Sequence, residues 1–231
     1  MHRAVKEENT EALQYMLANE QQVEPRDMSN STLLHTAAEK RNQYLCALLL
    51  KEHHADPNVV DYHDMTPLHR CQSDSGGVVV AEMLLEHCPD LVNRVDGHGK
   101  TALYLACEKG NQKMVKALLT KGRATPDIPG PGNCTPLIAA IDLAAQSSRK
   151  IPIVELLLKY GANPNIPDVD GRTAFAAAKN AGLAGSEIKR MLSLIPPRAS
   201  AATVNSTRRS NSERSLDSNG IRSLALSTHQ S

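Results

Sequence analysis

A phosphate-binding loop is the first chemistry that the sequence suggests. Gly99, Lys100 and Thr101 form a G-K-T triplet, which ends the glycine-rich loop that holds nucleotide phosphates in many enzymes. That loop also requires a glycine five positions before the G-K pair, where this chain has Arg94, and a buried strand in front of it. A leucine-rich segment and a turn precede the triplet instead. We therefore interpret Thr101 as a structural residue and expect no nucleotide-binding site.

Metal binding is the second possibility. His53–His54 and His87–Cys88 are adjacent pairs of ligand-type residues, but no other cluster has the spacing of a zinc site. The motifs of zinc proteases, serine hydrolases and dinucleotide-binding enzymes do not occur in the sequence either. We therefore expect no metal, no cofactor and no enzymatic activity.

Charge and composition narrow the range of partners. Lys and Arg number 26 and Asp and Glu number 25, a balance that does not favour nucleic acid or an acidic membrane. The five cysteines are scattered and include no C-x-x-C pair, as expected for reduced, buried thiols. The sequence has no secretory signal and no apolar run of about 18 residues. We expect a monomer in the cytoplasm, the nucleus or both, whose partner is neither nucleic acid nor a membrane.

Five segments that begin with threonine recur along the chain at intervals of 34 to 38 residues. Each of the first four is followed by a leucine cluster and then by a turn rich in Gly, Asn, Asp and Pro. This order predicts a helix, a short loop, a second helix and a connection. The threonine can cap the first helix, and neighbouring units must stack because neither helix can bury its apolar face alone. The anchoring residues are Thr32, Thr66, Thr101, Thr135 and Thr173.

The units resemble the ankyrin repeat, whose hallmarks are T-P-L-H-x-A-A, a leucine pair, a G-A-D-x-N turn and D-x-x-G before the next threonine. Residues 66–69 read T-P-L-H, residues 96–101 read D-G-H-G-K-T, and residues 161–165 read G-A-N-P-N. The resemblance covers residues 1 to about 194. It implies an all-α ankyrin-repeat solenoid of stacked helix–loop–helix units with β-turn fingers.

The repeats are expected to occupy residues 1–195, in five to six units of which the first is incomplete. A true N-terminal cap and a truncation remain alternatives for that first unit. Repeat 4 has extra residues near 144–150, which form either a partner-specific projection or merely a longer helix and loop. The units are placed at 1–27, 28–61, 62–96, 97–130, 131–168 and 169–195.

Residues 196–231 differ from the rest in composition. They contain nine Ser and five Arg, and their few apolar residues follow no pattern. Such a segment cannot offset the entropy lost on ordering, so we expect a disordered, Ser/Arg-rich tail. Arg208 and Arg209 precede Ser212 at a spacing that basic-directed kinases accept, which makes Ser212 a candidate phosphorylation site.

The resemblance implies that a partner binds the concave surface formed by the fingers and the inner helices. His35 and His69 occupy the histidine position of the repeat, which implies a structural hydrogen bond to a neighbouring turn. The residue after that position is expected to face outward, as in Thr36. Asn58 resembles a position that is hydroxylated in many ankyrin repeats. The expected contact residues are Tyr62, His63, Met65, Arg70, His98, Lys100, Leu105 and Arg172.

An extended surface without a reactive cluster favours a protein-interaction scaffold or adaptor. The alternative is a regulatory inhibitor that masks a transcription factor or an enzyme, with the tail as a phosphorylation switch. One stoichiometric partner in a pull-down would favour the inhibitor, and many partners would favour the adaptor.

Overall fold

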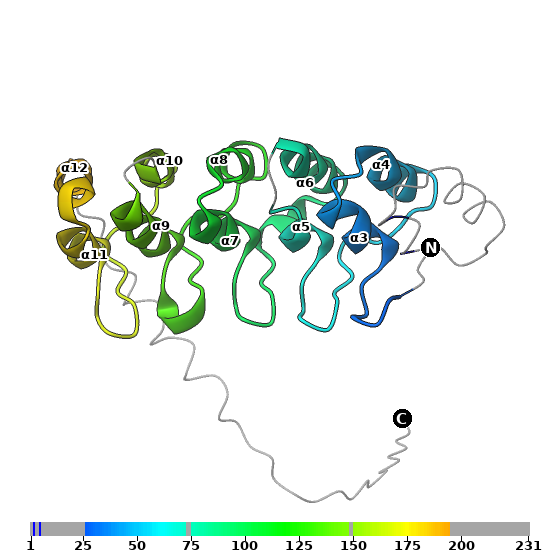
Figure 1. Ribbon diagram of the computed structural model, residues 1–231, viewed down its shortest axis with the longest axis horizontal. Coiled ribbons are helices and arrows are strands. Elements are labelled where there is room, and N and C mark those ends of the chain that lie inside the picture. Colours follow the sequence, from blue (N-terminus) through cyan, green and yellow to red (C-terminus); the bar gives the residue numbers. More distant parts are fainter. Residues whose placement is uncertain (1, 3–4, 6–25, 73–74, 148–149, 195–231) are drawn as a thin grey trace, which may run out of the picture. The chain divides into compact units, whose positions relative to one another are not determined.

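The computed structural model describes residues 2, 5, 26–72, 75–147 and 150–194. Ten α-helices in this part of the chain form five helix–loop–helix units (Figure 1). Two short 3-10 helices, η1 (Pro89–Asn93) and η2 (Pro131–Asn133), lie in the connections. The α-helices are α3 (Leu33–Glu39), α4 (Gln43–Lys51), α5 (Pro67–Arg70), α6 (Ser75–His87), α7 (Ala102–Lys109), α8 (Gln112–Thr120), α9 (Pro136–Gln146), α10 (Ile151–Lys159), α11 (Ala174–Asn180) and α12 (Gly182–Ser193).

The helices form two rows. Figure 1 shows α3, α5, α7, α9 and α11 in an inner row, α4, α6, α8, α10 and α12 in an outer row, and long loops that extend from the inner row away from the outer one. The described residues contain no β-strand, only an isolated bridge between Val95 and Thr101. The all-α solenoid predicted from the sequence is therefore confirmed.

The repeated threonines begin the inner helices, as predicted. The hydroxyl oxygens of Thr101 and Thr135 accept hydrogen bonds from the backbone N–H groups of Tyr104 and Ile138, at 3.1 and 3.3 Å. Each hydroxyl thereby satisfies one backbone donor that the first turn of a helix leaves free. Asn42 caps α4 in the same manner.

Small and aliphatic side chains fill the space between the two rows. Ala37, Ala106 and Ala140 on the inner helices are completely buried, and their size lets neighbouring helices approach closely. Cys46, Cys71 and Cys107 are buried in the same core, and desolvation by burial raises the pKa of each thiol. The core is therefore built from aliphatic residues and thiols rather than from aromatic rings.

The five long loops, called fingers here, share one backbone turn. The backbone N–H of the first finger residue donates to the carbonyl of the fifth in every case, at 2.8 to 3.1 Å. Fingers 1 to 5 comprise residues 27–31, 61–65, 96–100, 130–134 and 168–172, and finger n precedes the inner helix of repeat n.

The extra length of repeat 4 is partly helical. The inner helix α9 continues to Gln146, so that it has 11 residues where α7 has eight. Lys150 follows, and its ammonium group donates to the carbonyl of Gly110 at the end of α7, at 3.1 Å. The described part of this segment therefore packs back on repeat 3, which favours the longer helix over a projection.

Several predictions concern residues outside the described part of the chain. They are the disordered tail 196–231, its Ser212, and most of the incomplete unit 1–27, so these stay predictions. The boundaries of the individual units also stay predictions. In the described ranges, no helix has the length and apolar character needed to cross a bilayer.

Candidate functional site

A carboxylate holds the backbone of four fingers in place. In fingers 1, 2, 3 and 5 the first residue is Asp, whose Oδ1 accepts hydrogen bonds from the backbone N–H groups of the third and fifth residues. The eight distances lie between 2.8 and 3.1 Å. Because the Asp side chain substitutes for solvent at these donors, the fingers are ordered without extensive burial.

Adjacent fingers are also joined to one another. The N–H of Tyr62 in finger 2 donates to the carbonyl of Ser29 in finger 1 at 3.1 Å, and Gly97 in finger 3 donates to His63 in finger 2 at 2.8 Å. Finger 5 bonds to finger 4 through the equivalent residues. Finger 4 has Pro131 at the donor position, and proline has no N–H. The row of fingers is therefore bonded throughout except between fingers 3 and 4.

His35 and His69 couple each inner helix to the following finger. The backbone N–H of Thr32 can only donate, so Nδ1 of His35, 3.1 Å away, is the acceptor and Nε2 carries the proton. That Nε2–H donates to the carbonyl of Met65 in finger 2, at 2.8 Å. His69 repeats the arrangement, with its Nε2 3.2 Å from the carbonyl of Lys100 in finger 3. The structural role predicted for both histidines is confirmed, and desolvation by burial lowers the pKa of each.

Repeat 3 has Tyr104 where repeats 1 and 2 have histidine. Its ring packs on finger 4, where a β-carbon on Gly130 would lie 2.7 Å from Cε2 of the ring. Desolvation by burial raises the pKa of its hydroxyl. Gly130 occupies the position of the finger aspartates, so the larger Tyr104 and the missing Asp side chain occur together.

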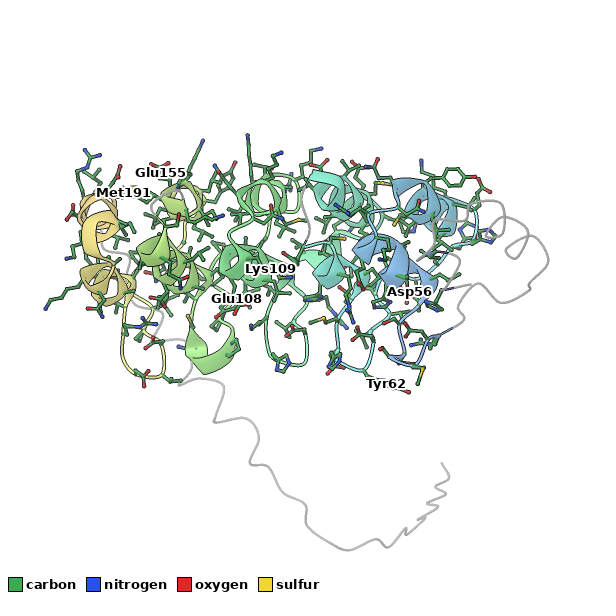
Figure 2. All side chains as sticks on the ribbon, in the orientation of Figure 1. Asp56, Tyr62, Glu108, Lys109, Glu155 and Met191 are labelled. Carbon is green, nitrogen blue, oxygen red and sulfur yellow. The ribbon has the colours of Figure 1, made fainter. Side chains whose placement is uncertain are left out.

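Three of the predicted contact residues are exposed on the fingers. Figure 2 shows Tyr62 at the tip of finger 2, and 73% of its surface is exposed. His63 follows it on the same tip, and His98 holds the equivalent position on finger 3. The hydrogen bond between His63 and Gly97 places these two tips side by side.

The three predicted basic contacts are each bound to an acid of the same chain. Arg70 on α5 pairs with Asp61 at 2.5 Å, and Lys100 pairs with Glu108 at 2.8 Å. The guanidinium of Arg172 donates to both oxygens of Asp142 on α9, at 3.0 and 2.9 Å, and to Asp168 in its own finger. Arg172 lies in finger 5, away from the fingers that carry Tyr62 and His98.

Burial opposes ionisation of Asp61 and Asp168, but the hydrogen bonds that each carboxylate receives outweigh it. The side chain of Arg70 and the N–H groups of finger 2 lower the pKa of Asp61. The backbone and side chain of Arg172 lower the pKa of Asp168. Both finger carboxylates are therefore held in the charged form.

The expected outward orientation of Leu105 is wrong. Leu105 is 7% exposed and Thr36, at the equivalent position of repeat 1, is 6% exposed. Inner helices lie on both sides of α7, so this face is largely covered. Met65 is half-buried, and its carbonyl accepts the bond from His35.

Two exposed residues of this surface were missed. Met28 in finger 1 is 99% exposed and Val169 in finger 5 is 72% exposed. Both occupy the second position of the finger, as Tyr62 does, and aligning the fingers on their first Asp would have revealed this. The candidate site is therefore the row of finger tips together with the adjoining inner helices.

Asn58, the predicted hydroxylation site, lies in the connection after α4. Its side chain is exposed, its backbone N–H donates to Asp56 at 2.8 Å, and its amide nitrogen lies 3.3 Å from the sulfur of Cys88. No described group of His, Cys, Asp or Glu residues has three members placed to bind a metal ion.

Known proteins share this architecture. The chain is 34% identical over 158 residues to the ankyrin repeat protein YahD of Escherichia coli (strain K12), which covers 68% of the chain and 76% of YahD. A crystal structure of an ankyrin repeat domain from Acinetobacter baumannii AYE has a TM-score of 0.74 and 30% identity, covering 84% of this chain and 95% of that domain. The palmitoyltransferase AKR1 of Lachancea kluyveri is 32% identical over 160 residues, but the chain spans only 21% of its length.

The family assignment rests on the sequence as well as on the fold. The family described as "Ankyrin repeats (3 copies)" matches residues 1–94 and 80–168. Ankyrin repeats are in general protein–protein interaction modules and are typically not enzymes. The finger turns, the threonine caps and the histidine bridges are the features by which the residues themselves produce that fold. The chain belongs to the ankyrin-repeat family.

Proposed function

We propose that this chain is a scaffold or adaptor that binds a protein partner through its finger tips and inner helices. The observation that carries the proposal is the exposure of large apolar side chains at the second position of fingers 1, 2 and 5. Met28, Tyr62 and Val169 are 99%, 73% and 72% exposed. Large apolar side chains that are held in water on ordered backbone are typical of interface residues.

The hydrogen bonds that hold the finger backbones in place support the same conclusion. Hydrogen bonds from the finger carboxylates and between neighbouring fingers already position the tips in the free protein. Binding then requires little additional ordering, which removes one of the main costs of association.

The experiment is a quantitative pull-down with the full chain as bait. A variant with Met28→Ser, Tyr62→Ala and Val169→Ser should capture its partners about tenfold less well, because the apolar contacts are lost. The matched control replaces Tyr44 and Tyr160, which are 53% and 38% exposed on or beside the outer helices, with alanine. Equal capture by wild type and the finger variant, or equal loss in the control, would exclude this surface.

Masking of one transcription factor or enzyme is the alternative use of the same surface. It requires a single partner at one-to-one stoichiometry, and phosphorylation of Ser212 that changes the affinity. Affinity measurement with Ser212→Asp and Ser212→Ala full-length chains tests the second requirement.

The other expected properties belong to the same proposal. We propose a monomer without catalytic activity that acts in the cytoplasm, the nucleus or both. Asn58 is proposed as a hydroxylation site because its side chain is exposed on a turn. Intact-mass measurement of the chain from native cells tests this, since hydroxylation adds the mass of one oxygen atom.

A further inference from the structure

Three fingers begin with the same buried aspartate but differ at its second carboxylate oxygen. Asp61, Asp96 and Asp168 are 3%, 4% and 8% exposed, and in each the Oδ1 atom accepts the two backbone hydrogen bonds of the finger. The Oδ2 atom of Asp61 accepts from Arg70, and that of Asp168 accepts from Arg172 at 3.0 Å. The Oδ2 atom of Asp96 is buried and has no hydrogen-bond partner in the described structure.

The Oδ2 atom of Asp96 lacks a hydrogen-bond donor among the described residues because repeat 3 differs from repeats 2 and 5 at two positions. Arg70 stands four residues after Thr66, and the residue four after Thr101 is Leu105, which cannot donate. Arg172 is the fifth residue of finger 5, and the fifth residue of finger 3 is Lys100. The ammonium group of Lys100 is bound to Glu108 at 2.8 and 2.9 Å, and it lies 5.5 Å from the centre of the Tyr104 ring. Neither position therefore supplies a cation to Asp96.

An unpartnered buried carboxylate oxygen is unfavourable. Leaving a buried acceptor unsatisfied costs about 1–3 kcal/mol, and more when the group is charged. Fingers 2 and 5 show how this fold relieves that cost, namely with a guanidinium group. Asp96 also lines an open depression of about 400 Å³, whose other charged residues are Asp64 and Arg94. The lining residues are Val60, Asp64, Asn93, Arg94, Val95 and Asp96.

We infer that Asp96 is a binding socket for an arginine side chain of the protein partner. The inference rests on the proposed function, since it names the chemistry of the partner that the fingers bind. The entering guanidinium would take the place at Asp96 that Arg70 takes at Asp61. A planar guanidinium can donate two parallel hydrogen bonds to a carboxylate, whereas an ammonium group acts as a point charge. A metal ion fits less well, because the site offers two carboxylates and no third ligand.

The socket is adjacent to the exposed apolar tips. Gly97, the residue after Asp96, is bonded to His63, which follows Tyr62 on the tip of finger 2. A partner whose arginine enters at Asp96 would thus place neighbouring apolar residues on Tyr62. Because the oxygen is buried in the free protein, an isolated arginine must displace part of its covering, and we expect millimolar affinity for it.

The test is an NMR titration of the isotope-labelled full chain with N-acetyl-arginine amide. The reporters are the backbone amides of His98 and Lys100, which donate to Asp96 at 2.9 and 2.8 Å. Arginine should shift them saturably, the lysine analogue about fivefold more weakly, and the neutral citrulline analogue not at all. Equal shifts with the lysine or citrulline analogue would overturn the assignment of a guanidinium socket.

Two variants test whether the arginine response depends on the Oδ2 atom of Asp96. Asp96→Asn keeps the Oδ1 acceptor of the finger but replaces Oδ2 with a donor, so the arginine-induced shifts should disappear. Leu105→Arg places the chain's own guanidinium where Arg70 stands in repeat 2, and it should abolish the response as well. The controls are Asp170→Asn, which removes an exposed finger acid, and Leu105→Met, and both should retain the response. Persistence of the shifts in Asp96→Asn overturns the inference even if Leu105→Arg does not fold.

The arginine titration and the pull-down test the socket and the finger-tip surface independently. The titration needs no partner, so Asp96-dependent shifts would stand even if the finger-tip variant captured proteins normally. Conversely, loss of capture in the finger-tip variant, with no arginine response, would support the surface and exclude the socket.

Discussion

Fingers 2 and 4 have the same closing hydrogen bond but obtain it with different side chains. Finger 2 begins with Asp61, whose carboxylate binds two N–H groups of the finger, and it receives the Nε2–H of His35. Finger 4 begins with Gly130 and contains η2, and it receives the ring of Tyr104. Gly132 and Asn133 in finger 4 have φ angles of 64° and 55°, a left-handed conformation that these two residue types tolerate.

The difference shows that each finger depends on two residues, its own first residue and the residue of the preceding inner helix that packs on it. A histidine is small enough to leave room for the aspartate of the next finger, whereas a tyrosine fills that room and requires glycine. The inner-helix residue and the first finger residue therefore have to match, and exchanging one without the other should be more damaging than exchanging both.

Removal of the finger carboxylate should give the largest effect. Asp61→Ala leaves two N–H groups of finger 2 and the half-buried Arg70 without their acceptor, and we expect the free energy of unfolding to fall by about 3 kcal/mol. Equilibrium unfolding in urea measures this. Asp170→Ala, at an exposed position of finger 5, should change it by less than about 0.5 kcal/mol. A similar small change for Asp61→Ala would mean that finger 2 does not depend on its aspartate.

Introduction of the aspartate into finger 4 should be the second largest effect. Gly130→Asp adds a side chain 2.7 Å from the Tyr104 ring, and overpacking of this kind costs about 2 kcal/mol. The double variant with Tyr104→His should recover most of that loss, because it recreates the pairing found between His35 and finger 2. Additive losses in the double-mutant cycle would contradict the matched-pair explanation.

The histidine-linked fingers should also differ from finger 4 in their response to acid. Burial lowers the pKa of His35 and His69 below the ordinary 6.5, so below about pH 6.5 the unfolded chain binds protons that the folded chain does not. The free energy of unfolding should therefore decrease as the pH falls below 6.5, until the folded histidines titrate as well. Urea unfolding at about pH 7.5 and about pH 5 measures the decrease.

Tyr104 contributes nothing in that pH range, because its hydroxyl pKa is raised above the ordinary value of 10. The variant with His35→Gln and His69→Gln should accordingly show a flatter pH dependence than the wild type. An unchanged slope in this variant would assign the acid sensitivity to other groups.

Restoring the bond between fingers 3 and 4 should have the smallest effect. Pro131→Ala supplies an N–H that can donate to the carbonyl of His98, as Tyr62 and Gly97 do at the other fingers. The gain of one hydrogen bond and the loss of the stiff proline nearly cancel, so stability should change by less than about 0.5 kcal/mol. Hydrogen exchange provides the sharper measurement, since the new amide should be protected. Rapid exchange of that amide in the Pro131→Ala variant would show that the two fingers stay apart for another reason.

One expectation about binding also changes. Arg70 was expected to be a contact residue, but it completes the hydrogen bonding of Asp61. Its replacement by alanine should therefore weaken finger 2 itself. Tyr62, which has an exposed side chain, remains the better probe of binding.

The repeat register, and with it most of the fold, could be predicted from the order and spacing of residue types. Threonine at a helix start, histidine three residues later, and aspartate before a tight turn each act through bonds to residues nearby in the chain. Such local hydrogen bonding depends on residue type and spacing, which a sequence displays directly. The helix pairs and the fingers were predictable for this reason, whereas the bonds of His35 and His69 to the following fingers span about 30 residues and were implied by the family resemblance.

Which side chains of the finger surface are available to a partner depends on contacts that form when the repeats pack together. Arg172 binds Asp142, 30 residues away, and Leu105 is buried among inner helices of neighbouring repeats. Exposure and ion pairing depend on the packing between repeats, and that packing is set by residues far apart in the chain.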